Sequence, residues 1–530
     1  MDRIKSPVGR RQFLIAGGAA STLALARTAE AAKPAAATGC GANQPATIKG
    51  LTVEKPVHTP APWPSTTAVM GSGRSGSGGG MPAGAAGGVG GGASRGAGAS
   101  GISGGMPGVV GKATPAIYIE DGKHLVDKSS PSAISEGKLT DLYSKGAKIS
   151  SKTAEVGGVY AKGVGTEYVL ADATIELDGD GPSGLGGPNG GAGAEEHATL
   201  IISNCTITTT GTWRTATSVQ NHGILKVYNS TLKSNGRPFK PDFTTTGQKT
   251  QLEVDGNCRT HVTLSNSYSY FYYSTIIAEG WAALSTDGAE GFLYLEANDC
   301  TVKTLTAGYG TYADGNCHNV LNRCTFEVAG MAGIIAGESD ITFTEPKAKC
   351  GSYFALIHNV FDPNDVGTLK VHGGEIQTKK PAILIKSANT EILLEGAKVK
   401  SDVGVLIKST MSVDPNAAKA ANTKGMNVYG IHATLKDMDV AGDIIHEDKE
   451  NRGMTIYFEA TNLRGAIKDA SIKMNRLSKW TATADSNVTI IGDVEVSQID
   501  APAGVTITAV AATSGTYKLT SCGTLVLKTA

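Results

Sequence analysis

The sequence predicts an all-β fold, a parallel β-helix in which the chain winds as a solenoid, from two short phrases that recur along it. The first phrase is an apolar run followed by a polar residue and often glycine. Its clearest copies are at 252–256, 284–288 and 311–315, and most spacings between copies fall in the twenties and thirties. A period of this size is typical of repeat architectures, in which equivalent residues of successive coils stack into columns.

The second phrase is a short strand that ends in asparagine and continues with threonine and an apolar residue. Copies lie at 204–206, 229–231, 298–301 and 322–325, after expected strands such as 199–202 and 292–295. Asparagine tolerates the left-handed conformation of a sharp corner, and stacked asparagines can pass amide hydrogen bonds between coils. Strand, asparagine corner, strand and glycine turn together describe one coil of a β-helix.

The first 31 residues have the pattern of an export signal. Arg10 and Arg11 stand side by side before a mildly apolar stretch, 14–25, and Ala29-Glu30-Ala31 offers the small residues of a cleavage site. The adjacent arginines favour a twin-arginine-type signal, so we expect export to a periplasmic or secreted location. An ordinary secretory signal is the alternative.

Composition divides the rest of the chain. Residues 32–112 are rich in glycine, alanine and proline and predict a flexible linker, whereas 113–530 predict the β-helix. Loop insertions are expected near 236–250, 258–270 and 414–425, where the repeat is interrupted. The formal net charge of zero gives no reason to expect a nucleic-acid partner.

The eight cysteines show no zinc-ligand spacing. Cys205, Cys300 and Cys324 occupy the same place in the second phrase, which predicts a column of small buried residues. Cys258 and Cys317 both follow the tripeptide Asp-Gly-Asn, and a disulfide between them is compatible with an oxidising compartment.

From about residue 114 to the end, the chain resembles the right-handed parallel β-helix superfamily of pectin-lyase-like proteins. Its phrases at 280–287 and 308–315 look most like those of exported bacterial β-helix proteins of poorly defined function. The resemblance implies a right-handed, single-stranded solenoid. The superfamily includes polysaccharide lyases, glycoside hydrolases, sugar epimerases and adhesins, so the resemblance implies the fold more firmly than any one activity.

Three aspartates end copies of the first phrase: Asp255, Asp287 and Asp314. In stacked coils they would lie ~5 Å and ~10 Å apart in one column, given the strand spacing. Carboxylates this close repel one another and raise at least one pKa, as a general acid beside a general base requires. These three are the predicted catalytic residues. Turns without chemistry, or a calcium ion held by the carboxylates, are the alternatives.

Eight further residues are predicted to bind substrate, because they extend the aspartate column or place aromatic rings beside it. They are His222, Glu338, His358, Tyr270, Tyr272, Trp281, Tyr309 and Tyr312. Lys386 and Lys408 occupy matching phrases further along and are expected to be solvated lysines.

Together these patterns predict an exported β-helix enzyme, a hydrolase or lyase that acts on a saccharide or glycoconjugate by carboxylate acid/base chemistry. No cofactor is required, although calcium would fit the carboxylates. The alternatives are a non-catalytic surface-binding or adhesin β-helix, and a lyase or isomerase of a small aromatic compound. The expected partner is a saccharide or small-molecule substrate, with no nucleic acid and no membrane span; the sequence sets no oligomeric state.

Overall fold

The computed structural model describes residues 46–59, 113–181, 186–237, 252–254, 256–287, 291–359, 364–413 and 429–530. The chain divides into two compact units, Met1–Gly39 and Cys40–Ala530. The first unit, which contains the predicted export signal, lies outside the described residues. So do most of the predicted linker and the predicted insertion at 414–425.

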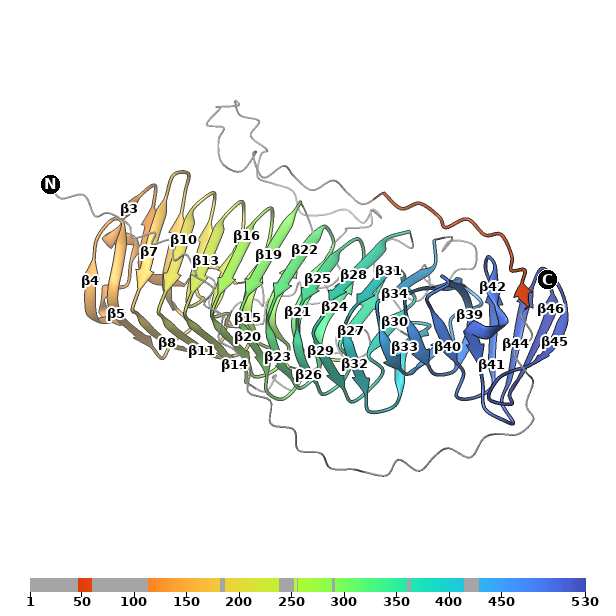
Figure 1. Cartoon of the computed structure of the whole chain (residues 1–530). Coiled ribbons are helices and arrows are strands. Elements are labelled where there is room, and N and C mark those ends of the chain that lie inside the picture. Colours follow the sequence, from red (N-terminus) through yellow and green to blue (C-terminus); the bar gives the residue numbers. More distant parts are fainter. Residues whose placement is uncertain are drawn as a thin grey trace, which may run out of the picture. The chain divides into compact units, whose positions relative to one another are not determined.

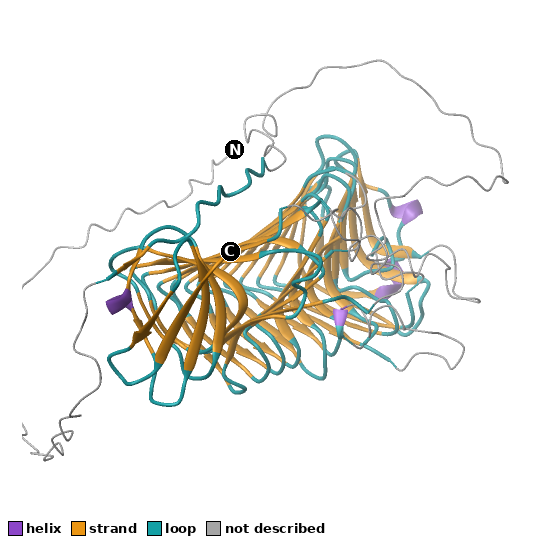
Figure 2. Cartoon of the chain, turned by 90° about the vertical axis from the view of Figure 1, so that its right-hand side faces the viewer, coloured by secondary structure: helices purple, strands orange, loops and turns teal. Residues whose placement is uncertain are grey.

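The second unit is a parallel β-helix, which confirms the predicted all-β solenoid. Along most of its length each strand pairs in parallel with the third strand after it, as β10 (Thr199–Ser203) does with β13 (Ile224–Tyr228). Three strands therefore complete one coil, and the coils stack side by side (Figure 1, Figure 2). The right-handed winding is the sense that parallel connections adopt in nearly all proteins.

The strands of successive coils form three long sheets, which we name after residues on their outer faces. The tyrosine sheet contains β7 (Glu167–Ala171), β10, β13, β16 (Tyr268–Tyr272), β19 (Leu293–Asn298), β22 (Cys317–Asn322), β25 (Asp340–Thr344), β28 (Val366–His372), β31 (Asn389–Glu395), β34 (Ile431–Lys436), β37 (Met454–Glu459), β39 (Ile467–Met474), β41 (Ser486–Ile490), β44 (Thr506–Ala511) and β46 (Thr524–Thr529).

The threonine sheet contains β8 (Thr174–Asp178), β11 (Thr206–Thr210), β14 (Thr231–Asn235), β17 (Thr275–Ala278), β20 (Thr301–Thr304), β23 (Thr325–Val328), β26 (Lys347–Cys350), β29 (Glu375–Thr378) and β32 (Lys398–Ser401). A smaller parallel sheet contains β35 (Asp439–Ala441), β38 (Asn462–Arg464), β40 (Lys479–Thr481) and β43 (Ile499–Asp500).

The aspartate sheet contains β2 (Thr114–Glu120), β6 (Val156–Lys162), β9 (Ala192–Glu195), β12 (Thr217–Val219), β15 (Arg259–Thr263), β18 (Ala282–Asp287), β21 (Tyr309–Asp314), β24 (Met331–Ala336), β27 (Ala355–His358), β30 (Ile383–Lys386), β33 (Val405–Thr410) and β36 (Asp443–His446). The remaining elements are β1 (Thr47–Ile48), β3 (Lys123–His124), β4 (Ile134–Leu139), β5 (Tyr143–Ser151), β42 (Val494–Glu495), β45 (Gly515–Lys518) and three single-turn helices, η2 (Val126–Lys128), η3 (Pro131–Ala133) and η5 (Val496–Gln498).

The corner between the tyrosine and threonine sheets is made by one residue with positive φ. Asn204 (φ 55) and Asn229 (φ 47) take this conformation, as the second phrase predicted. At a later corner the left-handed residue is Asp299 (φ 54), one place after Asn298. Asn298 instead accepts a 2.9 Å hydrogen bond from the amide of Asn322 in the next coil. Both predicted uses of asparagine therefore occur, but at different corners.

The cysteines at these corners are free and buried, which confirms the packing role predicted for Cys205, Cys300 and Cys324. Cys258 and Cys317 are also free and buried. The disulfide considered between them is therefore absent.

Antiparallel pairs stand at the two ends of the solenoid, β4 with β5 and β45 with β46. The last strands expected from the sequence, around 504–508 and 523–527, correspond to β44 and β46, which pair in parallel. A hairpin at an end covers the edge that a solenoid would otherwise expose. Among the described residues, no helix has the length and apolar character needed to cross a membrane.

Residues 46–59 are an ordered part of the region predicted as linker, which corrects that prediction. β1 pairs antiparallel with β42 near the C-terminal end. Further along the segment, Lys55 pairs with Glu391 at 2.8 Å, and His58 Nε2 lies 2.6 Å from Glu338 Oε1. The segment, red in Figure 1, thus lies beside the C-terminal coils and runs back toward the middle of the solenoid.

The predicted insertion at 258–270 is also corrected, because it contains a regular strand. β15 takes its place in the aspartate sheet between β12 and β18. Its residue His261 is fully buried and shares a 2.9 Å hydrogen bond with Thr217 in the preceding coil. A polar residue at an inward position hides the apolar alternation by which strands are recognised.

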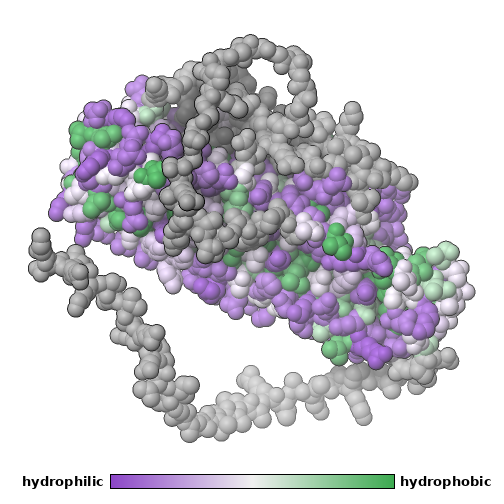
Figure 3. All heavy atoms as spheres, turned by 90° about the horizontal axis from the view of Figure 1, so that it is seen from above, coloured by the Kyte–Doolittle hydropathy of each residue, from purple (hydrophilic) through white to green (hydrophobic). Residues whose placement is uncertain are grey.

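Apolar side chains form two separate clusters. The larger one fills the interior of the solenoid. The smaller one, which we call the outer cluster, includes residues on the outward side of the aspartate sheet: Trp213, Leu252, Val254, Trp281, Ala282, Tyr309, Tyr312, Met331, Ile334, Ala336, Tyr353, Leu356 and Leu384. The described surface visible in Figure 3 is mostly hydrophilic, whereas the outer cluster is buried.

Candidate acid–base site

The outer face of the aspartate sheet carries two carboxyl groups side by side. Asp287, at the end of β18, and Asp314, at the end of β21, are direct partners in the parallel register. Their backbones are therefore one strand spacing apart, about 4.8 Å, which is the arrangement the sequence predicted for these two residues. Both are buried, with 7% of Asp287 and 1% of Asp314 exposed.

Arg259 neutralises the Asp287 carboxylate. β15 places Arg259 in the coil before Asp287, and the two side chains form a buried ion pair. The guanidinium also lies over the ring of Trp281, 4.2 Å from its centroid. Burial alone would lower the pKa of Arg259, but the carboxylate of Asp287 raises it above its usual value. The arginine therefore keeps its charge.

Asp314 lies in an environment that disfavours a negative charge. Tyr312 donates a 3.1 Å hydrogen bond to its Oδ2, but Oδ1 has no hydrogen-bond donor among the described residues. Burial raises the pKa of the Asp314 carboxyl well above its usual value, and the charge of Asp287 and a hydrogen bond between the two carboxyl groups raise it further. Such a bond needs a proton on one partner, so we assign the proton to Asp314.

Two tyrosine hydroxyls complete the polar group. Tyr309 shares a 3.1 Å hydrogen bond with Ser285, and its ring lies 5.3 Å from that of Tyr312. Burial raises the pKa of Tyr309 to about 12 and that of Tyr312 well above its usual value. Both hydroxyls are therefore neutral at neutral pH. We call the set of Arg259, Asp287, Asp314, Tyr309 and Tyr312 the acid–base cluster.

The column that contains the aspartates continues into three further coils. Ala336, His358 and Lys386 follow Asp314 in register. His358 is buried, and neither of its ring nitrogens has a hydrogen-bond partner among the described residues. Burial and the neighbouring Lys386 lower the pKa of His358 to about 3. This histidine is therefore neutral at neutral pH.

Residues 252–254 lie over this face of the sheet, and we call them the cover. Leu252 and Val254 belong to the outer cluster. Glu253 accepts three hydrogen bonds, from Lys386 Nζ at 2.7 Å, Tyr353 Oη at 2.9 Å and Lys380 Nζ at 3.2 Å. Burial opposes the charge of Glu253, but these contacts lower its pKa below the usual value. Glu253 therefore fastens the cover as a carboxylate.

The cover corrects the first copy of the aspartate phrase. The position that corresponds to Asp287 in the preceding coil is Leu264, because Thr263 is in register with Thr286. The phrase at 252–256 has the sequence pattern of a strand end, but its residues 252–254 form the cover instead. Asp255 itself lies outside the described residues.

Glu338 and His222 do not lie in the aspartate column, contrary to the prediction. In the coil that contains Glu338 the column position is Ala336, and in the coil that contains His222 it is Gln220. Each of the two predicted residues therefore lies two positions after the column. Glu338 pairs with His58, as described above. The exposed ring of His222 stacks on His197, with centroids 4.6 Å apart. The phrase alone does not show where a strand ends and its turn begins, so aligning the phrases placed these two residues in the wrong register.

Tyr270 and Tyr272 lie on another sheet from the acid–base cluster. Both are half-buried on the outer face of β16 in the tyrosine sheet. Tyr272 stacks on Tyr228 at 5.1 Å, and Tyr270 lies 5.8 Å from Tyr294. These four rings form what we call the tyrosine patch. Of the aromatic residues predicted to line the site, Trp281, Tyr309 and Tyr312 do lie beside the aspartates.

No sequence pattern pointed to Arg259 or Glu253. Arg259 lies in the stretch interpreted as an insertion, and the contact between Glu253 and Lys380 joins residues 127 positions apart. Lys386 was predicted to be solvated, but its side chain is 9% exposed. Its place in the phrase was the available signal, because that place puts it in the aspartate column.

The described residues contain no group of three or more histidine, cysteine, aspartate or glutamate side chains placed to hold a metal ion. At the aspartate pair, the positive charge comes from Arg259.

No protein-family model and no curated protein sequence matches the chain. Among solved structures, the tailspike protein gp49 from Pseudomonas phage LKA1 is similar, with 11% sequence identity and a TM-score of 0.25. The match covers 67% of this chain and 48% of that one, so the matched part is about half of the tailspike chain. The likeness concerns the fold alone.

Proposed function

We propose that this protein is an exported β-helix enzyme that acts on a saccharide or glycoconjugate by carboxylate acid/base chemistry, as a hydrolase or a lyase. Asp314 is the general acid and Asp287 the general base. One observation supports this assignment above all: Arg259 is paired with Asp287, whereas Asp314 is buried against that carboxylate with its pKa raised. Neighbouring groups whose environments push their pKa values apart are the usual basis of an acid/base pair.

Hydrolysis and elimination would use the pair in the same way. In hydrolysis, Asp287 takes a proton from the attacking water while Asp314 gives its proton to the leaving oxygen. In elimination, Asp287 takes the proton from the carbon adjacent to the one that carries the leaving oxygen. Asp314 again protonates that oxygen as the C–O bond breaks. The proton then returns from Asp287 to the neighbouring Asp314 carboxylate, which ends the adjacent strand. Tyr312 donates to Asp314 while that residue is ionised.

The direct register of Asp287 and Asp314 on adjacent strands favours a pair that acts from one side of the substrate. In most glycosidases the two carboxyl groups flank the scissile bond and stand about 5 Å or more apart. Here the two carboxyl groups end adjacent strands in direct register, and the Asp287 carboxyl raises the pKa of Asp314, as in dyads that hold one proton between two carboxyl groups. A water or a sugar hydroxyl above the pair would contact both.

A substrate reaches the pair when the cover moves, because both carboxyl groups are buried in the closed arrangement. Three hydrogen bonds to Glu253 fasten the cover. We propose that substrate binding breaks these bonds and displaces the cover, and that its return excludes water from the cluster between turnovers.

A screen of saccharide polymers with the full chain tests the proposal, with new reducing ends reporting hydrolysis and unsaturated products reporting elimination. On a substrate found in this way, Asp314→Asn should lower turnover by about 10²–10⁴-fold, the usual contribution of a general acid. Its thermal unfolding midpoint should not fall below that of the wild type, because asparagine has the shape of a protonated aspartate.

Asp299→Asn is the matched control, since Asp299 pairs with Arg323 at an exposed corner. It should keep full turnover. Full turnover in Asp314→Asn would remove Asp314 from the mechanism.

The tyrosine patch favours a second candidate function, saccharide binding without catalysis. Half-buried rings on an open sheet face can stack on sugar rings. In that case Tyr270→Ala with Tyr272→Ala should abolish saccharide binding, whereas Asp314→Asn should leave it unchanged and no product should form. Product formation that depends on Asp314 would exclude this function as the main one.

A further inference from the structure

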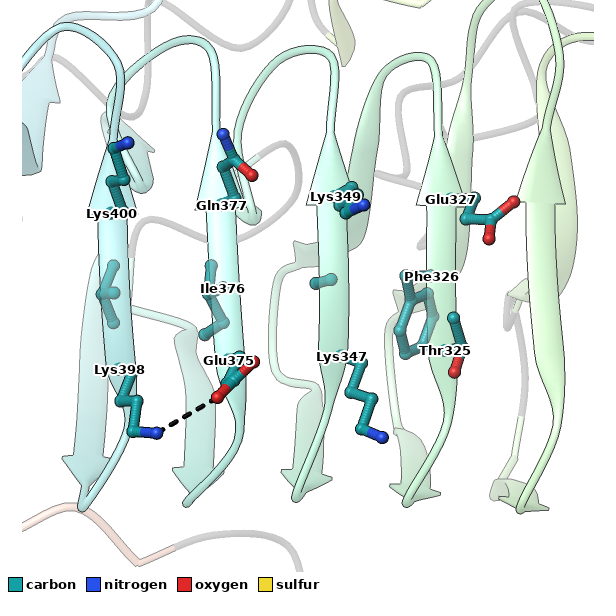
Figure 4. Close-up of a pocket in the computed structure, with 12 residues that line it drawn as sticks. Thr325, Phe326, Glu327, Lys347, Lys349, Glu375, Ile376, Gln377, Lys398 and Lys400 are labelled. Carbon is teal, nitrogen blue, oxygen red and sulfur yellow. Dashed lines mark hydrogen bonds and ion pairs between the residues drawn. The ribbon is translucent and has the colours of Figure 1, made fainter. Parts of the chain in front are cut away.

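The outer face of the threonine sheet carries an open trough with charged walls. Two rows of side chains stand along β23, β26, β29 and β32, above a floor of apolar residues. The trough has a volume of about 490 Å³. Figure 4 shows the lysines on both sides, Lys347 and Lys398 in the first row and Lys349 and Lys400 in the second.

In the second row a lysine recurs at every second coil. The residues in register are Lys233, Ile277, Lys303, Glu327, Lys349, Gln377 and Lys400. The lysines thus stand on the alternate strands β14, β20, β26 and β32. At one strand spacing per coil, the repeat is about 9.6 Å and the row of lysines spans roughly 29 Å.

Most of these lysines form no ion pair with the carboxylates that the structure describes. Lys303 pairs with Glu327 at 2.7 Å, but within the described part of the chain no ion pair involves Lys233, Lys349 or Lys400. Alternation keeps like charges out of direct register, which the stability of the sheet requires. Of the three intervening positions, Glu327 carries a counter-charge, whereas Ile277 and Gln377 carry none. The row is therefore a positive strip on a chain whose net charge is zero.

A row of hydroxyl groups runs beside the lysines. Six successive coils carry threonine at the first-row position: Thr174, Thr206, Thr231, Thr275, Thr301 and Thr325. These threonines are exposed or half-buried, and Lys347 follows Thr325 in the same row. Over the coils from β14 to β23, a ligand would meet a hydroxyl at each coil and a cation at every second coil. Beyond β23 the first row continues with Lys347, Glu375 and Lys398.

We propose that the threonine face binds a linear anionic polysaccharide, one that carries carboxylates and lies along the solenoid axis with about one sugar per coil. An extended sugar chain advances by about one strand spacing per residue. When such a chain has two-fold symmetry, every second carboxylate points to the same side. Those carboxylates would meet Lys303, Lys349 and Lys400 in turn, while the threonine hydroxyls of the coils up to β23 bond to sugar hydroxyls. This surface lies on a different sheet from the acid–base cluster, so the proposal is independent of the proposed catalysis.

Fluorescence anisotropy of the full chain with labelled galacturonate oligomers of increasing length tests the proposal. Affinity should rise in steps of two sugars up to about the seven coils of the lysine row, as each step adds one lysine contact. Lys349→Gln with Lys400→Gln should weaken binding of the longest oligomer by about tenfold, the scale of two exposed charge contacts. Asp314→Asn should bind as tightly as the wild type, which separates this surface from the catalytic proposal.

Lys152→Gln with Lys528→Gln is the matched control, because both lysines are exposed and lie outside the threonine sheet. This variant has the same net charge and should bind within about twofold of the wild type. Neutral dextran should not bind, and double-stranded DNA at equal charge should not displace the oligomer. Equal weakening in the two lysine pairs, affinity without the two-sugar step, or displacement by DNA would each overturn the proposal in favour of unspecific charge attraction.

Discussion

The outer faces of the aspartate sheet and of the threonine sheet, here called the aspartate face and the threonine face, belong to the same coils. Charged side chains are buried on the first face and exposed on the second. On the aspartate face, Asp314 is 1% exposed. On the threonine face, the ion pair of Lys398 and Glu375 is 3.1 Å long, and its side chains are 81% and 68% exposed. Register brings charged groups together on both faces. The difference between the two faces shows that burial decides whether neighbouring charged groups also shift one another's pKa values.

The two faces also solve like-charge repulsion differently. The second row of the threonine face places glutamate, glutamine or isoleucine between successive lysines. The aspartate face places two carboxyl groups in direct register. It tolerates them because Arg259 compensates one charge and a proton on Asp314 removes the other. Such an arrangement costs stability and is typical of functional sites.

The largest expected effect comes from breaking one ion pair on each face. Asp287→Asn leaves the Arg259 guanidinium buried without its partner, so the free energy of unfolding should fall by about 3–5 kcal/mol. Glu375→Gln breaks an exposed pair and should cost less than about 1 kcal/mol. Chemical denaturation of both variants beside the wild type measures the contrast. Equal losses would mean that water reaches both pairs alike.

The pH dependence of stability sharpens the contrast at Asp314. Its pKa in the fold lies well above the usual 3.8 that we assign to the unfolded chain. Between these two values the folded state holds a proton that the unfolded state has released. Wild-type stability should therefore fall as the pH rises through this range, by up to about 1.4 kcal/mol per pH unit for this group.

Asp314→Asn has no such titration, so its stability relative to the wild type should increase from acidic to neutral pH. Denaturation curves of both proteins across this range give the comparison. A difference that stays constant with pH would show that Asp314 is ionised in the folded protein.

The smallest expected effect concerns the cover. The pKa of Glu253 lies below its usual 4.5 in the fold, so its contacts stabilise the closed cover above that pH and are lost as the pH falls through the lowered value. Glu253→Gln should speed hydrogen exchange at 252–254 by about tenfold or more, because charged hydrogen bonds contribute roughly 1.5–3 kcal/mol. Glu375→Gln should leave exchange there unchanged. Identical exchange in the wild type and Glu253→Gln would show that other contacts hold the cover.

Part of the site follows from the repeat and part does not. The pairing of Asp287 with Asp314 was predictable, because both end the same phrase in consecutive coils and the stacking rule puts such residues in register. The same reasoning failed for the phrase at 252–256, because an apolar-polar-apolar stretch before Asp-Gly can be a strand end or, as at 252–254, a segment that packs on the outside of a sheet.

The roles of Arg259 and of the cover could not be predicted from the repeat, for a related reason. A solenoid fixes contacts between adjacent coils, whereas the cover contacts coils far along the chain through Tyr353 and Lys386. Whether a face is open or covered is a property of tertiary packing, and burial on this face raises the pKa of Asp314.

Infrared spectroscopy at neutral pH tests most directly whether Asp314 holds a proton. A protonated carboxyl group has a C=O stretch well separated from the carboxylate bands. We predict such a band in the wild type, its loss in Asp314→Asn and its retention in Asp299→Asn. A wild-type spectrum without the band, or a band that persists in Asp314→Asn, would contradict the assignment of Asp314 as the acid of the pair.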